Sequence, residues 1–263
     1  MSILGIDIGT STTKIVEVKE GIIVNKIIIR NGFSKEKLEK FVFENNINIE
    51  KIVFTGIGAS KVNLDEYDVP VKIVDEFSAI ARGGLLLAKK EKALVASVGT
   101  GTAFIEVSGN NAKHLGGTGV GAGTLYNICN KMLGISSFDE IVELAQIGNV
   151  EKVDLRIKDI TTDEIPTLPL DLTLSNFGKF AEDTKKEDIV IGLINMIFEV
   201  IGMMAVFITS KSDIKEVIFI GNITVIPGVK YVLDRIEKVQ NIKFIVPENT
   251  EFAVVLGAID ASK

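Results

Sequence analysis

The segment Asp7–Lys14 reads D-I-G-T-S-T-T-K and combines a carboxylate, a glycine, four hydroxyls and a lysine. Successive backbone N–H groups and hydroxyls at such a turn form a concave site for an anion. A carboxylate beside them can hold a magnesium ion through water. A bare hairpin turn would explain Gly9 but not the remaining residues, so we expect phosphate binding here. The candidate ligands are Asp7, Ile8, Gly9, Thr10, Ser11, Thr12, Thr13 and Lys14, with Asp7 as the magnesium ligand.

Two later segments also present bare backbone. V-G-T-G-T (Val98–Thr102) is a second donor-rich turn, and its candidate phosphate ligands are Thr100, Gly101 and Thr102. The glycine-rich H-L-G-G-T-G-V-G-A-G-T (His114–Thr124) precedes an expected helix, and a helix N-terminus attracts phosphate. Two loops that grip a phosphate chain from opposite sides form an electrostatic clamp. A flexible glycine loop is the alternative; dinucleotide binding is disfavoured, because a strand–hairpin–strand rather than a βα unit leads into these glycines.

Two shorter motifs end buried strands. V-D-E-F (Val74–Phe77) delivers Asp75 and Glu76 to the end of a strand. A carboxylate there can accept the proton of a substrate hydroxyl during attack on phosphorus, or the acid pair can stabilise a helix N-terminus through the helix dipole. V-I-F-I-G-N (Val217–Asn222) stops at Gly221, where either a nucleoside lies against the bare turn or an ordinary strand–helix junction forms.

Hydrophobic periodicity predicts strands followed by helices, twice over. The first half has expected strands at 4–8, 13–19, 22–30, 51–55 and 71–74, and expected helices at 34–46 and 77–89. The second half has expected strands at 94–98, 102–108, 217–220 and 243–246, one more that ends near Leu115, and helices at 124–133, 189–208, 229–239 and 251–261. Glu20-Gly21 predicts a hairpin turn, and two prolines predict a long loop at about 161–174.

The two halves are related by an internal repeat. Shifting the sequence by 90 residues places Leu4 on Leu94. The other matches are Gly9 on Gly99, Thr10 on Thr100, Thr12 on Thr102 and Ile15 on Ile105. Each copy reads strand, Gly-Thr turn, strand, which indicates a duplicated α/β domain. We therefore expect domains at 1–92 and 93–263, with the two phosphate loops facing each other.

Composition restricts the class of protein and its chemistry. The 263 residues carry a formal charge of −6, which argues against a broad face for nucleic acid or for membrane lipid. The single Cys129 excludes an intrachain disulfide, and the single His114 excludes a two-histidine metal site. The N-terminus lacks the charged region of a signal peptide, so we expect a cytoplasmic protein. The apolar segment 189–208 has the length of a membrane span, but Asn195 and Glu199 within it favour a helix buried in the protein or in a subunit interface.

In this order the motifs resemble the actin-like (ribonuclease H-like) ATPase fold, a duplicated α/β fold of two domains with an ATP cleft between them. Within that superfamily the chain resembles the type II pantothenate kinases over nearly its whole length. The resemblance is carried by D-I-G-T-S-T-T-K, D-E-F-S-A, V-G-T-G-T, L-G-G-T-G-V-G-A-G-T, V-I-F-I-G-N and L-G-A-I. D-L-T-L-S-N-F-G (Asp171–Gly178) is the discriminating motif, because other actin-like ATPases have no such segment.

The resemblance implies ATP-dependent phosphorylation of pantothenate to 4′-phosphopantothenate, the first step of coenzyme A biosynthesis, with ATP, Mg²⁺ and a homodimer. It implies that Glu76 is the general base for the pantothenate hydroxyl and that Thr100 and its neighbours form the second phosphate loop. The apolar helix from Ile189 would lie in or near the dimer interface. The residues expected against the nucleotide are Ala122, Gly123, Thr124, Leu125 and Tyr126 at a helix start, Phe138, and Gly221 and Asn222 in the adenosine region.

One position departs from the family pattern. The family has an arginine before the Gly-Gly pair, where this chain has His114. A neutral imidazole offers one donor where a guanidinium offers a cationic fork. We therefore expect the substrate side, formed by His114, Gly117 and Thr118, to bind pantothenate more weakly or in a pH-dependent manner, or to bind a related substrate, unless the adjacent Lys113 substitutes.

Two alternative functions remain open on the sequence. The first is a kinase of the same fold for another small hydroxylated compound, such as pantetheine or a sugar. The second is a nucleotide-binding ATPase or activator without kinase activity. The related dehydratase activases hold an iron–sulfur cluster with two cysteines per subunit, which Cys129 alone cannot supply.

Overall fold

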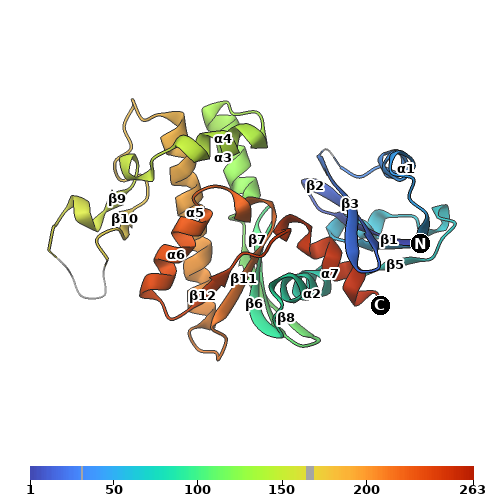
Figure 1. Cartoon of the computed structure of the whole chain (residues 1–263). Coiled ribbons are helices and arrows are strands. Elements are labelled where there is room, and N and C mark those ends of the chain that lie inside the picture. The colour runs from blue at the N-terminus through green and yellow to red at the C-terminus, as the bar shows by residue number, and fades with distance from the viewer. Residues whose placement is uncertain (31, 164–168) are drawn as a thin grey trace.

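Two five-stranded sheets lie on either side of a pair of helices in the computed structural model, which describes residues 1–30, 32–163 and 169–263 (Figure 1). The first sheet has the order β3-β2-β1-β4-β5 and the second the order β8-β7-β6-β11-β12. The first comprises β1 (Ser2–Ile8), β2 (Thr12–Lys19), β3 (Ile22–Arg30), β4 (Ile49–Thr55) and β5 (Val71–Ile73). The second comprises β6 (Lys92–Val98), β7 (Thr102–Ser108), β8 (Asn111–Thr118), β11 (Glu216–Ile220) and β12 (Lys243–Ile245).

The two sheets have the same connectivity, which confirms the duplication. In each, the first strand pairs antiparallel with the second and the second with the third. In each, the first strand also pairs parallel with the fourth, and the fourth with the fifth. The first strands, at Ser2–Ile8 and Lys92–Val98, are offset by the same 90 residues as the sequence repeat.

Two irregularities alter the register of these hairpins. The predicted Glu20-Gly21 turn joins β2 to β3, and both residues have positive φ, as a tight two-residue hairpin requires. Farther along, Val18 faces Ile23 whereas Glu17 faces Asn25, so one extra residue bulges from β3. A second shift follows Phe104 of β7, where β8 carries the extra residue.

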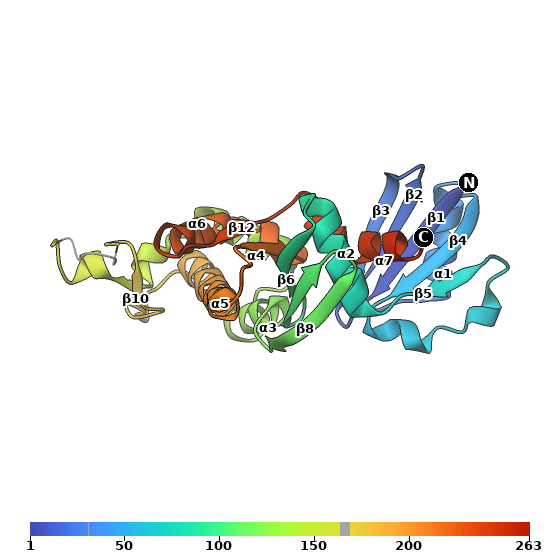
Figure 2. The same cartoon turned by 90° about the horizontal axis from the view of Figure 1, so that it is seen from below.

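Two helices exchange between the halves. Helix α2 (Glu76–Ala88) follows the first sheet, yet its Ile80 and Leu85 pack with residues of the second sheet. Helix α7 (Ala253–Ala261) follows the second sheet, yet its Val255 and Ile259 pack with valines of the first. Both views show α2 and α7 between the two sheets (Figures 1 and 2).

Glycines allow α2 and α7 to approach closely. A Cβ added at Gly83 would lie 1.9 Å from the carbonyl oxygen of Ala253, and one added at Gly257 would lie 2.0 Å from that of Ala79. No side chain can occupy such a space. The two helices therefore touch backbone to backbone along the line that joins the halves.

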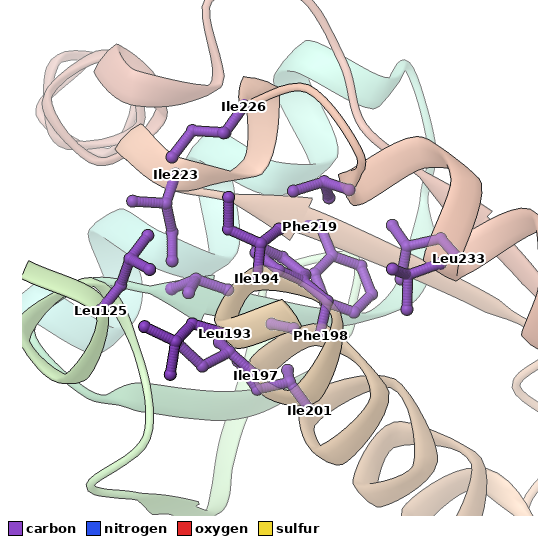
Figure 3. Close-up of a cluster of buried hydrophobic side chains, with 14 of the residues drawn as sticks. Leu125, Leu193, Ile194, Ile197, Phe198, Ile201, Phe219, Ile223, Ile226 and Leu233 are labelled. Atoms are coloured by element: carbon purple, nitrogen blue, oxygen red, sulfur yellow. The ribbon is translucent and has the colours of Figure 1, made fainter. Parts of the chain in front are cut away.

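The apolar segment in the second half is a core helix. Helix α5 (Lys186–Thr209) is long and apolar enough to cross a membrane by composition. However, Ile194, Ile197 and Phe198 are fully buried in a cluster with Phe219 of β11 (Figure 3). This burial bears out the buried-helix prediction. The other helices whose residues join this core are α3 (Ala122–Leu133), α4 (Phe138–Ile147) and α6 (Val229–Val239).

The polar residues within α5 anchor the motif 171–178. Glu199 accepts hydrogen bonds from Thr173 Oγ1 (2.7 Å) and Asn176 Nδ2 (2.8 Å) and pairs with Arg235 of α6. Asn195 donates to Asp154 Oδ2 (2.7 Å), and Asp154 Oδ1 accepts from the Phe177 N–H (2.8 Å) of the motif. Asn195 and Glu199 therefore hold this excursion of the chain on the helix, which explains two polar side chains in so apolar a segment.

The remaining elements refine the expected boundaries. Helix α1 (Lys35–Glu44) has Ser34 as its N-cap and covers the first sheet on the face opposite α7. The predicted strand near Leu115 extends to Thr118, and the predicted helix 251–261 is α7 preceded by a short 3₁₀ turn. Helix α4 was not expected, nor were the short strands β9 (Leu155–Arg156) and β10 (Thr173–Ser175). Part of the predicted loop, 164–168, lies outside the described residues. The 3₁₀ helices are Ile57–Lys61, Leu64–Glu66, Val150–Lys152, Ile157–Asp159, Asn222–Val225 and Thr250–Phe252.

Candidate active site

The two predicted phosphate loops meet. Ser11 Oγ, in the turn between β1 and β2, lies 3.0 Å from Thr100 Oγ1, in the equivalent turn between β6 and β7. The first turn is closed by the Gly9 N–H, which donates to the Thr12 carbonyl (3.0 Å). Both hydroxyls are exposed. Donor-rich turns from the two halves thus face one another at a single solvent-accessible point, as the sequence repeat predicted.

Asp7 is a buried carboxylate at the edge of this meeting point. It is only 5% exposed, and Lys14 Nζ lies 3.4 Å from its Oδ2. Burial raises the pKa of Asp7, and the charge and hydrogen bond of Lys14 oppose this rise. Thr55 is its register partner on β4, and the fully buried Thr55 hydroxyl has no hydrogen-bond partner within the described part of the chain. Partners in register share a face of the sheet, so Asp7, Lys14 and Thr55 form one polar row.

Glu76 lies within electrostatic reach of that row. Its pKa is raised first by burial and then by the negative charge of Asp7, while Lys14 lowers it. The neighbouring Asp75 is the N-cap of α2 and accepts a hydrogen bond from the Ser78 N–H (3.0 Å). Of the two acids of V-D-E-F, Asp75 therefore caps the helix, and Glu76 remains the candidate general base.

Some residues of the glycine-rich loop pack closely against the second phosphate loop, whereas Gly119 faces open space. The Ala122 and Gly123 N–H groups donate to the carbonyls of Gly99 (2.8 Å) and Thr100 (3.0 Å). A Cβ at Gly101 would lie 2.5 Å from the Thr118 carbonyl oxygen. These contacts brace the second phosphate loop against the start of α3. Gly119 differs, because a Cβ there would meet no described atom within 4 Å, which leaves room for a ligand.

Several predicted residues take part in the fold through their side chains. Ile8 and Leu125 are buried in the two cores. The Thr13 hydroxyl is buried on the face opposite Asp7, since Thr13 pairs with Ile8. Thr102 Oγ1 donates to the Val120 carbonyl (2.8 Å). The hydroxyls of Thr124 and Tyr126 bond the carbonyls of Gly119 (3.0 Å) and Ser136 (3.3 Å), respectively.

The predicted substrate residues lie on β8 beside α2. His114 stacks on Phe77, with ring centroids 4.3 Å apart and an interplanar angle of 15°. Phe77 directly follows Glu76, so this stack holds the imidazole close to the start of α2. Thr118 Oγ1 accepts from the Val120 N–H (3.2 Å), and a Cβ at Gly117 would lie 2.3 Å from the Thr102 carbonyl oxygen. His114 is thus the residue of this group with an open side chain.

The predicted adenosine region has a counterpart in the first half that the sequence reasoning missed. Gly221 directly follows β11 at φ +123°, and a Cβ there would lie 2.1 Å from the Val98 carbonyl oxygen. Gly56 directly follows β4 at φ +88°, and a Cβ there would lie 2.6 Å from Asp7 Oδ1. The 90-residue comparison could not pair these equivalent positions, because Gly56 and Gly221 are 165 residues apart. Asn222 Oδ1 is buried without a partner in the described chain, and is therefore a candidate acceptor for a ligand.

Phe138 also lies where the halves meet. The Arg30 guanidinium, at the end of β3, lies over its ring at 5.1 Å from the centroid. Arg30 was not anticipated from the sequence, although it is the register partner of Thr12 in the first phosphate loop.

Among the described residues, no group of three His, Cys, Asp or Glu side chains could bind a metal directly. Asp7 offers one buried carboxylate next to the unpartnered hydroxyl of Thr55, which suits a Mg²⁺ ion that keeps most of its waters.

A cavity of about 700 Å³ lies at the far end of α2, where Arg82 pairs with Asp260. It contains none of the predicted site residues, so the contacts described above, rather than cavity size, define the site.

Two comparisons with known protein sequences give matches. Residues 92–237 match the family described as Fumble. Type II pantothenate kinase from Staphylococcus aureus (strain USA300) is 28% identical over 228 residues, which cover 83% of this chain and 84% of that protein.

Solved structures share the fold. The activator of the 2-hydroxyisocaproyl-CoA dehydratase from Clostridium difficile with bound ADPNP has a TM-score of 0.70 at 21% identity, covering 98% of this chain and 92% of that chain. A ROK family glucokinase from Streptomyces griseus in complex with glucose and AMPPNP has a TM-score of 0.61 at 12% identity, covering 99% of both chains. The expected duplicated actin-like ATPase fold is thereby confirmed.

Proposed function

Because the chain belongs to the Fumble family, we propose that it transfers the γ-phosphoryl group of ATP to the primary hydroxyl of pantothenate. The product is 4′-phosphopantothenate, and the reaction is the first step of coenzyme A biosynthesis. The likeness to a type II pantothenate kinase supports this substrate. The observation that carries the proposal is the Ser11–Thr100 hydrogen bond, because a phosphate chain that enters between these loops meets donors from both halves.

Glu76 is the general base in this proposal. Burial and the charge of Asp7 raise its pKa, which brings it closer to the operating pH and makes it a stronger proton acceptor than an ordinary glutamate. It takes the hydroxyl proton as the substrate oxygen attacks phosphorus in line. Lys14, close to Asp7, supplies positive charge next to the phosphate loop.

Asp7 is the residue that would hold Mg²⁺. Lys14 Nζ lies 3.4 Å from one oxygen of its carboxylate, so we propose that Asp7 contacts the ion through water rather than directly. When bound, the ion neutralises charge on the phosphate oxygens. The unpartnered hydroxyl of Thr55, on the same face of the sheet, offers a further oxygen to the water shell.

The nucleoside lies toward Gly221 and Asn222, and the acceptor substrate lies toward His114, Gly117 and Thr118 on β8. The Phe77–His114 stack supports this placement, because it puts the imidazole next to the helix that begins with Glu76.

A homodimer and a cytoplasmic location are part of the proposal. Phe207 of α5 is 69% exposed and Val200, on the same helix, is 39% exposed. A second copy that covers these side chains would remove apolar area from water.

A coupled ADP-release assay with ATP and pantothenate tests the reaction. We expect the Glu76→Gln variant to lose at least about 100-fold in kcat, the lower end of the contribution of a general base. Glu50→Gln, an exposed acid on β4, is the matched control and should stay within about twofold of wild type. Wild-type turnover no higher than that of Glu76→Gln would refute the assignment.

A second candidate, a kinase for an uncharged relative such as pantetheine, is favoured by one observation. Where the family has an arginine this chain has His114, and a neutral imidazole offers a carboxylate one N–H donor in place of a cationic fork. We expect the kcat/KM ratio of pantothenate to pantetheine to rise in His114→Arg, because a guanidinium pairs with a carboxylate in bidentate fashion. An unchanged ratio would remove His114 from substrate selection.

Cys129 argues against a cluster-bearing activator. It is fully buried in the second core, and burial raises its thiol pKa to about 11. The thiolate is the form that binds a metal, and this environment disfavours it.

A further inference from the structure

Arg30 has a position on the first sheet that relates it to the phosphate loop. It is the last residue of β3 and the register partner of Thr12, two residues before Lys14 on β2. Lys14 is in turn the register partner of Asp7. Side chains alternate along a strand, so Arg30, Thr12, Lys14 and Asp7 all lie on the same face. This is the face that meets α7 and the second half.

The other cations on that face have oxygen partners within the chain. Lys14 pairs with Asp7, and Lys26 bonds Asn249 Oδ1 (2.7 Å). Lys51 and Lys72 bond the carbonyl oxygen of Ser262 (2.7 and 3.4 Å). Arg30 is different: within the described part of the chain it has neither an ion pair nor a hydrogen bond. Its contact is the ring of Phe138, in the other half.

This contact leaves the guanidinium chemically available. A guanidinium over an aromatic ring is attracted to the ring through the flat face of the guanidinium. The N–H groups at the edge of the guanidinium remain free to donate. Those five N–H groups form the fork that binds phosphate oxygens best. Glu140 of the same helix as Phe138 already accepts from the Ser136 N–H (3.3 Å), and Asp139 is exposed with no ion pair to Arg30 in the described structure.

We propose that Arg30 is a nucleotide-binding residue whose guanidinium, held by Phe138, binds the terminal phosphates of a nucleoside triphosphate between the two halves. This inference rests on the proposed function, because it needs a triphosphate at the Ser11–Thr100 loops. Phe138 acts through Arg30, as the platform that holds the guanidinium against the second half.

Direct binding tests the role of Arg30 apart from catalysis. Affinities for AMPPNP and for ADP are measured by calorimetry on wild type, Arg30→Gln and Arg30→Lys. We expect Arg30→Gln to weaken the binding of AMPPNP by at least about tenfold, because a charged hydrogen bond to phosphate is lost. The binding of ADP should weaken by no more than about threefold. Arg30→Lys should fall between, since it keeps the charge but loses the fork. The salt dependence of AMPPNP binding should become shallower in Arg30→Gln.

Lys19→Gln is the matched control. Lys19 is an exposed cation on β2, at the end away from the phosphate loop, and no ion pair involves it in the described structure. It should change AMPPNP affinity by less than twofold. The urea midpoint of each variant checks that the fold is intact.

A double-mutant cycle tests Phe138. If it acts through Arg30, Phe138→Leu weakens AMPPNP binding in wild type but adds little in the Arg30→Gln background. Additive losses would overturn the platform role of Phe138.

The binding results distinguish a failure of the role proposed for Arg30 from a failure of the proposed kinase function. Wild-type binding of AMPPNP that Arg30→Gln leaves unchanged overturns the role of Arg30 alone. Equal losses for AMPPNP and ADP also overturn it, since Arg30 would then only fasten the halves together. A wild-type protein that binds neither nucleotide overturns this inference and the proposed kinase together.

Discussion

At the scale of single residues, Glu76 is the group whose ionisation matters most. Because its pKa is raised, chiefly by burial, the basic carboxylate forms only at a pH above the ordinary value of 4.5. We therefore predict that the acid limb of kcat/KM for pantothenate has its midpoint above pH 4.5, with activity rising as pH rises through it. Lys14 lowers this pKa, so Lys14→Met should move the limb to still higher pH. A limb at or below 4.5 would contradict the environment described for Glu76.

Gly56 gives a second prediction at this scale. It has φ +88°, and a Cβ would collide with Asp7 Oδ1, whereas Gly21 has φ +80° and open space. Ala at Gly21 costs about 1–2 kcal/mol in backbone strain. Gly56 has φ +88° and ψ 163°, a combination that is essentially restricted to glycine, and Gly56→Ala adds a steric cost of about 1–3 kcal/mol. Urea unfolding should show Gly56→Ala less stable than Gly21→Ala by at least the steric part. Equal losses would mean that neither the backbone nor Asp7 resists the added methyl group.

Arg30 shows why some residues that lie beside the candidate site could not be predicted. Counting outward from the Glu20-Gly21 turn puts Ile29, not Arg30, opposite Thr12. The bulge in β3 shifts the register by one residue and turns Arg30 to the face of Asp7. Asp7, Ser11 and Thr100 were predictable because their motifs are continuous in sequence. A register shift leaves no such local signal.

At the scale of elements, the contact between α2 and α7 depends on the absence of side chains. A Cβ at Gly257 would lie 2.0 Å from the Ala79 carbonyl oxygen and 2.3 Å from the Gly83 nitrogen. We predict that Gly257→Ala lowers the free energy of unfolding by about 1–3 kcal/mol, despite the better helix propensity of alanine. Gly202→Ala in α5 is the control. It meets only the flexible tip of Ile236 within 3 Å and should stay within about 1 kcal/mol of wild type.

The order of the helices and strands could be predicted from the sequence, but not which sheet each helix packs against. Alternation and turn residues predicted the strands of both sheets, and Ser34 correctly marked a helix start. Helix α4 had a comparable signal that went unused, since Ser137 caps it and accepts from the Glu140 N–H (3.1 Å). The exchange of α2 and α7 had none. An apolar helix face shows that a helix is buried, but not which of two similar sheets it covers.

At the scale of the whole molecule, the Ser11–Thr100 hydrogen bond couples the halves when no nucleotide lies between them. A double-mutant cycle with Ser11→Ala and Thr100→Ala should give a coupling of about 0.5–1 kcal/mol in thermal unfolding of the free protein. Saturating AMPPNP should reduce this coupling toward zero, because each hydroxyl then bonds to phosphate. Coupling that persists unchanged would place the phosphate chain elsewhere.

The exchange of helices also sets the order of events during synthesis. The last strand of the first sheet ends at Ile73, whereas the helix that covers its valines begins at Ala253. A ribosome that adds about 5–20 residues per second separates the two by roughly 9–36 s. During that interval Val16, Val18 and Val53 lack their cover from α7 in the nascent chain. The first half to be made is therefore the last to be finished, because its apolar face stays open to water until α7 is synthesised.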